Sequence, residues 1–410
     1  MKLKIFLFGL LAFHSACFAQ LSLQECRQKA RNNYPMIKQY KLVEQSCDFN
    51  IDNASKGFLP QISLTGMALY HTDMLKKTQP ALNMKNSLYG GMVQISQTVY
   101  DGGAIAEQKR LNMASANAEK EQINVTIYDV NARVDELFFG VLLIDEQLKQ
   151  NELLRNDLSL SRKNIEGMMK NGVANQSDID AIHVEQLNAE QSRKTLNIQR
   201  QAFLSMLGFF INQKIDNNTV FSRPEAENPS ILQIERPELK QIDTQLSLLD
   251  EREKALNVNL KPKIGLFATG LLGNAGLDMM NKQALMAGVK LSWNIGSLYT
   301  RKNDRKLIDL SRQQWESNRE TFLFNIHLQT ENETSVINDL KEKLQTDDEI
   351  INLRTNIRNK AERKVENGTL TVNEMLRQIN AESEAKQAKA LHQIQLLKEI
   401  YQLKNICNYK

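Results

Sequence analysis

The sequence predicts a mainly α-helical protein with a β membrane barrel, in which each protomer is a duplicated helix–strand–strand–long helical hairpin. Three observations carry this prediction: long stretches without proline, four short segments of alternating polarity, and the repetition of both along the chain. The composition agrees, because 41% of the 410 residues are hydrophobic but only 6% are aromatic. Such a chain is rich in helix formers and poor in the side chains that fill compact cores.

The two halves of the chain repeat the same landmarks. Gly172 and Gly368 each follow an asparagine, and they lie 196 residues apart. The alternating segments that begin at Val93 and Val289 have the same offset of 196 residues. Several landmarks at one fixed offset indicate an internal duplication.

Residues 1–19 have the features of a signal peptide. Two lysines precede an apolar run, and small residues follow up to Ala19, after which we expect cleavage. The run is too short to span about 30 Å of hydrocarbon. Lipidation of Cys17 is the alternative, although His14 stands where a lipobox usually has leucine. Both alternatives predict an exported protein.

Four short segments alternate apolar and polar residues, which is typical of strands with one apolar face. The alternation is clearest at Val289, Leu291, Trp293 and Ile295. The predicted strands span about 58–71 and 88–101 in the first half and about 261–273 and 284–297 in the second.

The apolar face of each predicted strand needs a cover. Beyond the signal peptide the sequence has no run of 18 apolar residues and therefore predicts no transmembrane helix. Outer-membrane lipid is then the expected cover, and a closed barrel pairs every backbone group in hydrocarbon. Four strands cannot close a barrel, since the smallest membrane barrels need about eight. Several copies of the chain must therefore contribute strands.

Each predicted strand pair is followed by a stretch without proline, residues 104–167 and 301–366. A helix over either stretch would be about 100 Å long at 1.5 Å per residue. From Ile127 to Leu148 apolar residues recur at alternating spacings of three and four, which is the heptad pattern of a coiled coil.

An Asn-Gly pair ends each long helix, because both residues tolerate turn conformations. The predicted hairpin tips span about 168–178 and 364–374, and a returning helix follows each one. Asp178 and Glu374 lie near the first turns of the returning helices, where an acidic side chain favours the helix dipole.

These landmarks divide the exported chain into three parts. The first repeat covers residues 20–210, and the second repeat covers residues 237–410. Residues 211–236 form a linker that is rich in proline and asparagine, which mark loops.

Together these features resemble the TolC-like outer-membrane efflux proteins (the outer membrane factor family) over essentially the whole exported chain. In the first half, the matching segments are FLPQISLTG, QTVYDGG and the tip motif ending in DIDAI. In the second half, they are RPEL, LSWNIG and the tip motif ending in EMLRQI. The resemblance implies a homotrimer with a 12-stranded barrel and a helical barrel that extends into the periplasm. It also implies a passive duct in the cell outer membrane of a Gram-negative bacterium.

The same resemblance implies partners. A periplasmic adaptor (membrane fusion) protein and an inner-membrane pump of the RND or ABC type would complete the duct. The cargo stays open between drugs or metals and secreted proteins.

The resemblance assigns function to the hairpin tips. Asp178 matches a gate aspartate, and Glu374 matches one acid of a constriction ring, where three carboxylates around one axis attract cations and repel one another. Two turn triplets match the family's adaptor-contact positions: Asn171, Gly172 and Val173 in the first half, and Asn367, Gly368 and Thr369 in the second.

Two departures from the family's pattern bear on the gate. The tyrosine and arginine partners of the gate aspartate fall at Val365 and Leu370, so that polar lock is absent. The second acid of the constriction ring falls at Arg377. One hypothesis is that Glu374 and Arg377 of neighbouring copies form ion pairs instead.

The sequence contains no pattern that favours an enzyme. Its five histidines are scattered, and it has no HExxH or CxxC motif, so we expect no metal and no cofactor. The formal charge of +4 gives no reason to expect nucleic acid. Cys26, Cys47 and Cys407 are expected to be unpaired. The alternative function is a non-pore periplasmic coiled-coil scaffold, which leaves the four strands unexplained.

Overall fold

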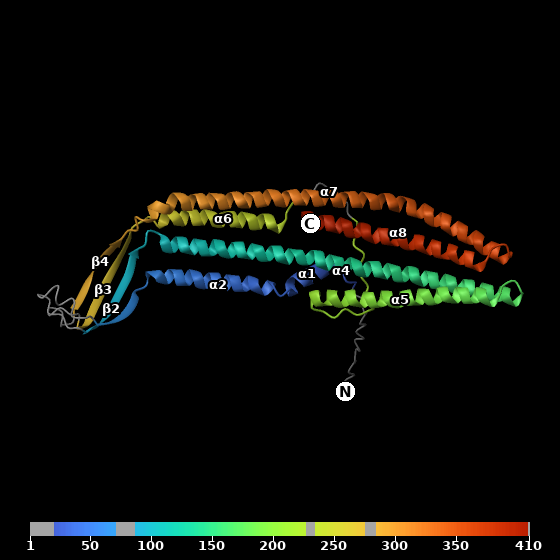
Figure 1. Ribbon diagram of the computed structural model, residues 1–410, viewed down its shortest axis with the longest axis horizontal. Coiled ribbons are helices and arrows are strands. Elements are labelled where there is room, and N and C mark those ends of the chain that lie inside the picture. Colours follow the sequence, from blue (N-terminus) through green and yellow to red (C-terminus); the bar gives the residue numbers. More distant parts are fainter. Residues whose placement is uncertain (1–19, 71–86, 227–233, 275–283, 409–410) are drawn as a thin grey trace, which may run out of the picture. The chain divides into compact units, whose positions relative to one another are not determined.

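The computed structural model describes residues 20–70, 87–226, 234–274 and 284–408. The predicted signal peptide with Cys17 lies outside the described residues, as does most of the loop between the strands of each pair. The described chain is mainly helical with one antiparallel sheet (Figure 1), which confirms the predicted fold class in these coarse terms. The elements are α1 (Leu23–Asn33), α2 (Ile37–Ser55), the 3-10 helix η1 (Lys56–Phe58), β1 (Gln61–Tyr70), β2 (Ser87–Tyr100), α4 (Ala104–Lys170), α5 (Gln176–Ile211), α6 (Pro237–Val258), β3 (Lys263–Asn274), β4 (Ala284–Ser292), α7 (Ser297–Glu366) and α8 (Val372–Cys407).

The duplication in the sequence recurs in the elements. Each half of the chain runs through two strands, one very long helix and one returning helix. The long helices α4 and α7 have 67 and 70 residues, and the returning helices α5 and α8 have 36 residues each. The two halves therefore fold alike.

The sequence favours a single helix over residues 22–56, but this prediction is wrong, because two helices occupy the stretch. Helix α1 ends at Asn33, and α2 begins at Ile37. Pro35 lies between them, and a proline disfavours helical backbone at the residue before it and removes one N–H donor. Ser22 and Glu25 form a capping box at the start of α1.

Strand β4 is shorter than its sequence pattern. It ends at Ser292, whereas the alternation of apolar residues continues to Ile295. The indole N–H of Trp293 donates a hydrogen bond to the carbonyl of Leu260 over 2.9 Å. The N–H of Leu298 then bonds to the carbonyl of Ile295 over 3.0 Å in a turn that leads into α7. These local bonds replace the ladder at the end of the strand.

The chain divides into two compact units, and each takes segments from both halves of the sequence. One, here called the sheet unit, comprises the described residues of Met36–Thr126 and Pro237–Phe324. The other, here called the hairpin unit, comprises the described residues of Met1–Pro35, Ile127–Arg236 and Asn325–Lys410. Helices α4 and α7 contribute to both units.

The sheet unit contains all four strands, in the order β1-β2-β3-β4. All neighbouring pairs are antiparallel, and the β2–β3 pair joins the two halves of the sequence. Strands β1 and β4 are the edges of this sheet. Apolar side chains on these edge strands are strongly exposed, including Ile62, Leu64, Val289 and Leu291 at 68 to 78%. The described chain therefore leaves an apolar sheet surface uncovered.

The turn from β2 into α4 explains the glycine-rich segment DGGA. Gly102 and Gly103 have φ of 72° and 92°, which a side chain rarely tolerates. The Asp101 carboxylate accepts hydrogen bonds from the N–H groups of Gly103 (2.8 Å) and Ile105 (2.6 Å). Asp101 therefore caps the first turn of the long helix, which accounts for the motif.

The hairpin unit has two hydrophobic clusters. The first joins α1, α4, α5 and α8 around Cys26, Val134, Phe138 and Leu207, all of them 0% exposed. Phe221 of the linker completes this cluster, with its ring 5.3 Å from that of Phe138. The second cluster lies at the hairpin tips.

A polar network ties the N-terminal helix of this unit to the C-terminal one. The Nε of Arg27 donates to Asp135 over 2.6 Å, and its Nη2 donates to Asn405 over 3.0 Å. Tyr128 donates to the carbonyl of Asn405 over 2.6 Å. Helix α1 is therefore in contact with the C-terminal helix α8. The three described cysteines are free, as predicted.

Candidate functional site

The first hairpin tip is a short turn between α4 and α5. The N–H groups of Asn171 and Val173 donate to the carbonyl of Met168 over 3.1 and 2.9 Å. The N–H of Gly172 donates to the carbonyl of Met169 over 3.0 Å, and its φ is 73°. The Asn-Gly pair thus ends the long helix as the sequence predicts, because glycine adopts the left-handed conformation without strain.

The second tip, between α7 and α8, has nearly the same backbone. The N–H of Gly368 donates to the carbonyl of Val365 over 2.9 Å, and its φ is 66°. Thr369 binds the carbonyl of Lys364 with both its N–H (2.8 Å) and its hydroxyl (3.0 Å). The side-chain hydroxyl adds a bond that Val173 cannot make in the first tip.

Both turn triplets are accessible. All six predicted adaptor-contact residues are exposed. A Cβ atom built on Gly172 or Gly368 would meet no atom of the described chain within 4 Å. The surface over each glycine is therefore open to close approach by another backbone.

Asp178 and Glu374 occupy the same position in the two returning helices. Asn175 and Thr371 begin these helices, and each side chain accepts a hydrogen bond from the backbone N–H three residues later. The Asp178 carboxylate accepts from the N–H of Asn175 over 3.0 Å, and the Glu374 carboxylate accepts from the hydroxyl of Thr371 over 3.1 Å. Each acid thus completes a capping box, a role that a charge can hold beside the positive end of a helix.

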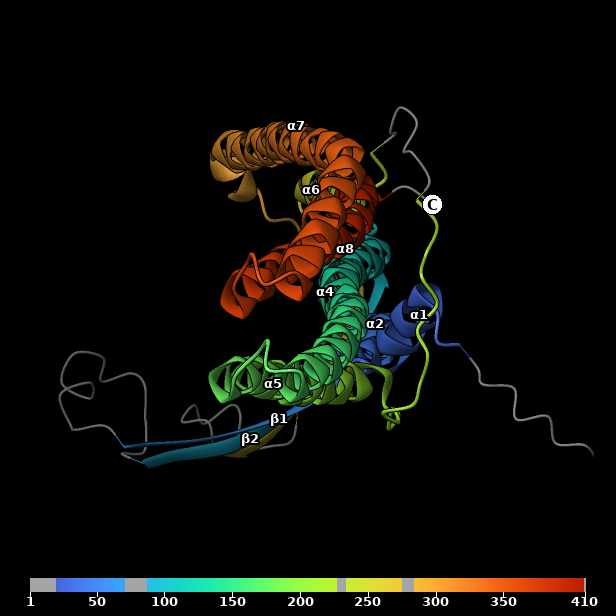
Figure 2. The same ribbon diagram turned by 90° about the vertical axis from the view of Figure 1, so that its right-hand side faces the viewer.

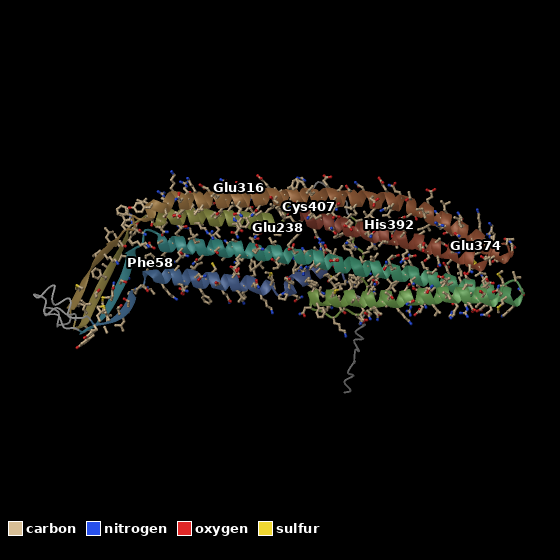
Figure 3. All side chains as sticks on the ribbon, in the orientation of Figure 1. Phe58, Glu238, Glu316, Glu374, His392 and Cys407 are labelled. Atoms are coloured by element: carbon tan, nitrogen blue, oxygen red, sulfur yellow. The ribbon has the colours of Figure 1, made fainter. Side chains whose placement is uncertain are left out.

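Arg377 has no such local role. Its side chain is exposed, and within the described residues it forms no ion pair with Glu374, which lies three residues earlier in α8. Figure 3 shows Glu374 at the tip end of this helix. The guanidinium of Arg377 is thus available to a group outside the protomer.

The positions of the missing polar lock are apolar and packed. Val365 is 3% exposed and belongs to the tip cluster, and Leu370 packs against the same cluster. The cluster joins the two hairpins, because it contains Ile165 of α4, Ile179 of α5 and Ile379 of α8. Apolar contact therefore stands where the family pattern has a polar link.

A charged cluster also connects the hairpins, and sequence reasoning missed it. Arg358 of α7 donates from Nη1 to Asp157 of α4 over 2.9 Å and to Glu382 of α8 over 3.1 Å. Its Nε donates to Glu362 over 2.9 Å. Burial works against the charged guanidinium, but these three acids raise the pKa of Arg358 above its ordinary value. Arg358 therefore stays charged and links three helices.

The first repeat contains the matching arginine without the cross-link. Arg162 donates to Glu166 over 2.9 Å and to Gln186 over 3.3 Å, and these residues precede Arg358, Glu362 and Glu382 by 196 positions. None of these contacts leaves the first hairpin. The repeated spacing of Arg and Glu was visible in the sequence, but Asp157 on the other hairpin was not.

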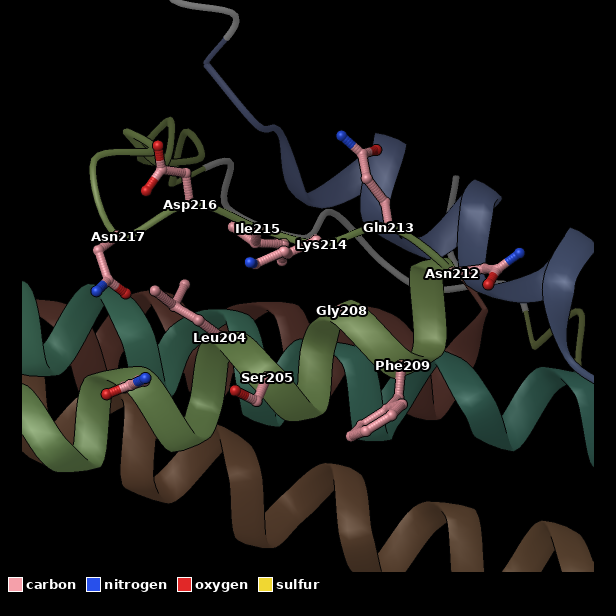
Figure 4. Close-up of a pocket in the computed structure, with 11 residues that line it drawn as sticks. Leu204, Ser205, Gly208, Phe209, Asn212, Gln213, Lys214, Ile215, Asp216 and Asn217 are labelled. Carbon is pink, nitrogen blue, oxygen red and sulfur yellow. The ribbon is translucent and has the colours of Figure 1, made fainter.

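The hairpin unit also contains two recesses away from the predicted site residues. One is an open pocket of about 880 Å³ between the end of α5 and residues 212–217, and Phe209 points away from that segment (Figure 4). Its charged lining consists of Lys214 and Asp216. The other has about 550 Å³ and is lined by residues of the polar network, including Asp135 and Asn405. Neither contains a predicted site residue.

Two negative findings concern the described residues alone. No helix there has both the length and the hydropathy of a membrane span. No group of three or more histidine, cysteine, aspartate or glutamate side chains there has an arrangement suited to a metal ion.

No protein-family model matches the sequence, and no curated protein matches it. Solved structures do. The outer-membrane channel OprN superposes with a TM-score of 0.69 at 12% identity, over 95% of this chain and 90% of that one. The outer membrane protein VceC from Vibrio cholerae has a TM-score of 0.69 at 10% identity, over 94% and 95% of the two chains. The open-state MtrE outer membrane channel of Neisseria gonorrhoeae has a TM-score of 0.67 at 13% identity, over 94% and 88%.

The predicted resemblance to TolC-like channels is thereby confirmed at the level of the fold. The match covers most of both chains in each case, so it is not limited to one helical hairpin. These structures are outer-membrane proteins, in agreement with the predicted location.

Proposed function

We propose that this chain, which has the fold of the outer-membrane efflux channels, is the outer-membrane duct of a tripartite efflux or secretion system. Three copies form a passive channel without enzymatic activity, each giving four strands to a 12-stranded barrel. The observation that carries the proposal is the sheet itself. Its four strands have exposed apolar side chains and two free edges, in a chain whose long helical hairpins match those of known channels.

The free edges of β1 and β4 support assembly from several copies. An unpaired strand edge in hydrocarbon leaves backbone N–H and C=O groups without partners, and each such group costs several kcal/mol. If β4 of one copy pairs with β1 of the next, every edge is satisfied. Lipid then covers side chains such as Leu64 and Val289.

The edges of the hairpin unit support the same assembly. Helices α5 and α7 lie at opposite edges of this unit (Figures 1 and 2). Exposed apolar residues follow one face of α7 at Ile350, Leu353 and Ile357, with spacings of three and four. On α5 the exposed apolar residues include Ile198 and Phe209. Packing of α5 on α7 of the next copy would bury both sets, as a coiled coil does.

The tips are the proposed gate and docking site. The exposed turns at Gly172 and Gly368 receive the periplasmic adaptor, which connects the duct to an inner-membrane pump of the RND or ABC type. Asp178 and Glu374 narrow the periplasmic entrance, and their carboxylates set its ion preference. The tip cluster around Val365 and the Arg358–Asp157 link hold the two hairpins together in the closed state.

Arg377 is proposed to pair with Glu374 of a neighbouring copy. The motive is that Arg377 is exposed without an ion pair in the described protomer, one helical turn after an acid of the entrance. Arg377→Ala is expected to increase leak current in planar bilayers by a few fold. Conductance and leak equal to the wild type would remove this ion pair from the account.

Fractionation and crosslinking test the assembly. The full chain, expressed in a Gram-negative host, is expected in the outer membrane as a trimer under chemical crosslinking. A soluble periplasmic monomer or dimer would instead favour the scaffold alternative. The genes beside this one would indicate the cargo: an RND transporter points to drugs or metals, and an ABC exporter points to proteins or peptides.

A further inference from the structure

Two lysines are the only charged residues in the four described strands. They are Lys263, the first residue of β3, and Lys290 of β4, and we call them the strand lysines. Strands β1 and β2 contain no charged residue. Both lysine side chains are exposed, and within the described residues neither forms an ion pair or a side-chain hydrogen bond.

The strand lysines lie next to each other on the polar face of the sheet. The residues that follow them, Ile264 and Leu291, pair with each other on the apolar face. Because successive residues of a strand point to opposite faces, both lysines point to the polar face. Lys263 pairs with Ser292, two residues after Lys290, so the lysines are diagonal neighbours. Side chains in such positions are roughly 7 to 8 Å apart, within reach of long side chains.

No acid lies beside the strand lysines on this face of the described sheet. The nearest positions of the same face on β2 are Ser96 and Thr98, which pair with Phe267 and Gly265 of β3. All four are uncharged. Neighbouring like charges repel each other in a sheet, and this costs free energy. An anion from outside the described chain would remove that cost.

The segments that continue these strands do not supply the missing negative charge. Residues 248–263 and 290–307 together contain nine cations and only four acids. The matching segments of the first repeat, residues 46–61 and 94–111, contain three cations and four acids. The surplus of positive charge around β3 and β4 therefore remains when every acid is counted as charged, and only the second repeat has it.

The fold does not require these two charges. In the first repeat Gln61 follows Pro60 as Lys263 follows Pro262, and Gln94 precedes Lys290 by the common offset of 196 residues. Glutamine therefore serves at both positions of an equivalent strand pair. A lysine on an edge strand can discourage unwanted strand pairing, which would explain the lysine of β4. That reason does not apply to β3, which lies inside the sheet.

We propose that the strand lysines form an anion site on the inner face of the barrel, for molecules that carry several phosphate or carboxylate groups. This inference rests on the proposed function, because lipid on the apolar face turns the polar face toward the lumen. Three copies then place their lysines around one lumen, and rings of lysine or arginine line pores that select anions. The entrance acids Asp178 and Glu374 belong to the hairpin unit, so the duct has two sites of opposite charge.

Block of the channel current by tripolyphosphate tests the proposal. The wild-type full-length protein in planar bilayers is expected to be blocked at about 100 mM salt, where exposed charges are only partly screened. Lys263→Gln/Lys290→Gln installs the residues of the first repeat and is expected to raise the half-blocking concentration roughly tenfold. Lys263→Arg/Lys290→Arg keeps the charges and is expected to retain the block.

Two further variants separate the strand lysines from the general charge of the protein. Lys38→Gln/Lys41→Gln removes the same charge from exposed lysines of α2 in the sheet unit and is expected to leave the block unchanged. Gln94→Lys adds a lysine to the polar face and is expected to lower the half-blocking concentration. Absence of block in the wild type, or equal shifts in the two double glutamine variants, would overturn the proposal.

Isothermal titration calorimetry of the purified full-length protein with tripolyphosphate keeps the two proposals apart. Current that tripolyphosphate does not block contradicts the anion site alone. A protein that carries no current contradicts the proposed function, and calorimetry then decides on the site. Binding that Lys263→Gln/Lys290→Gln weakens and Lys38→Gln/Lys41→Gln does not would support it. No binding, or equal binding in all three proteins, would overturn it.

Discussion

Arg358 on α7 donates a hydrogen bond to Asp157 on α4 over 2.9 Å, although the two residues are 201 positions apart in the sequence. The matching arginine of the first repeat, Arg162, bonds only within its own hairpin. One member of a duplicated pair of charged clusters has thus become a connection between hairpins. If the hairpins separate when the channel opens, this connection must break.

Asp157→Ala is therefore expected to favour opening. The variant removes the contact between hairpins and leaves Arg358 bound to Glu362 and Glu382, so the loss should be about 1 kcal/mol per protomer. Leak current through planar bilayers should rise several-fold. Glu166→Ala is the matched control, since it removes a half-exposed carboxylate from the same helix whose partner lies within the hairpin. Equal leak in both variants would show that the contact has no part in closure.

Glu374→Gln separates the cap from the gate. Glutamine serves in a capping box as glutamate does, so thermal stability should fall only by the lost attraction between the charge and the helix dipole, about 0.3 to 1 kcal/mol. The charge is lost, however, and the cation preference of the channel should fall. Reversal potentials in a salt gradient measure this preference. An unchanged reversal potential would leave Glu374 with a capping role only.

Glu399 predicts a dependence of stability on pH. Burial, together with the neighbouring Glu333 carboxyl, raises the pKa of Glu399 from 4.5 to about 7. Gln402 donates to Glu333 over 3.0 Å, and Lys398 lies 3.9 Å from Glu399. Between these pKa values the folded protein holds a proton that the unfolded chain has released. Stability should therefore fall as the pH rises from about 4.5 to about 7.

Thermal unfolding followed by circular dichroism checks this prediction. The wild type should lose on the order of 2 kcal/mol between pH 5 and pH 8, and Glu399→Gln should flatten the profile. Glu382 should not interfere. Burial alone would raise the pKa of Glu382, but hydrogen bonds from Lys386, Thr355 and Arg358 hold it below its ordinary value. The contribution of Glu382 to stability is therefore lost only at lower pH. A profile that slopes equally in the variant would exclude Glu399 as its source.

The regular parts of the fold could be predicted because their signals are local or periodic. The absence of proline and the heptad spacing from Ile127 to Leu148 predicted α4, and the offset of 196 residues extended that prediction to α7. The Asn-Gly pairs predicted both tips. Each of these signals depends on neighbours in sequence, which is where helix and turn preferences act.

The structure differs from the sequence-based predictions where a single residue overrides a periodic pattern. Pro35 divides the expected first helix, and the hydrogen bond from Trp293 to Leu260 accompanies the early end of β4. The Asp157–Arg358 contact was not predictable for another reason. Its two residues meet only after both hairpins pack, and nothing in the spacing of either half names the partner.

The two capping boxes could also be predicted from the sequence. Asn175 with Asp178 and Thr371 with Glu374 have the spacing of a capping box, which the sequence shows directly. The gate role of both acids stays a prediction, because an acidic side chain at this position suits a helix cap as well as a channel constriction.

Planar-bilayer recording of the purified full-length protein tests the central claim, a passive duct gated at its tips, most directly. Discrete steps of small conductance are predicted for the wild type, with longer open times for Asp157→Ala. A folded trimer from the outer membrane that carries no current, in the wild type and in this variant alike, would contradict the account.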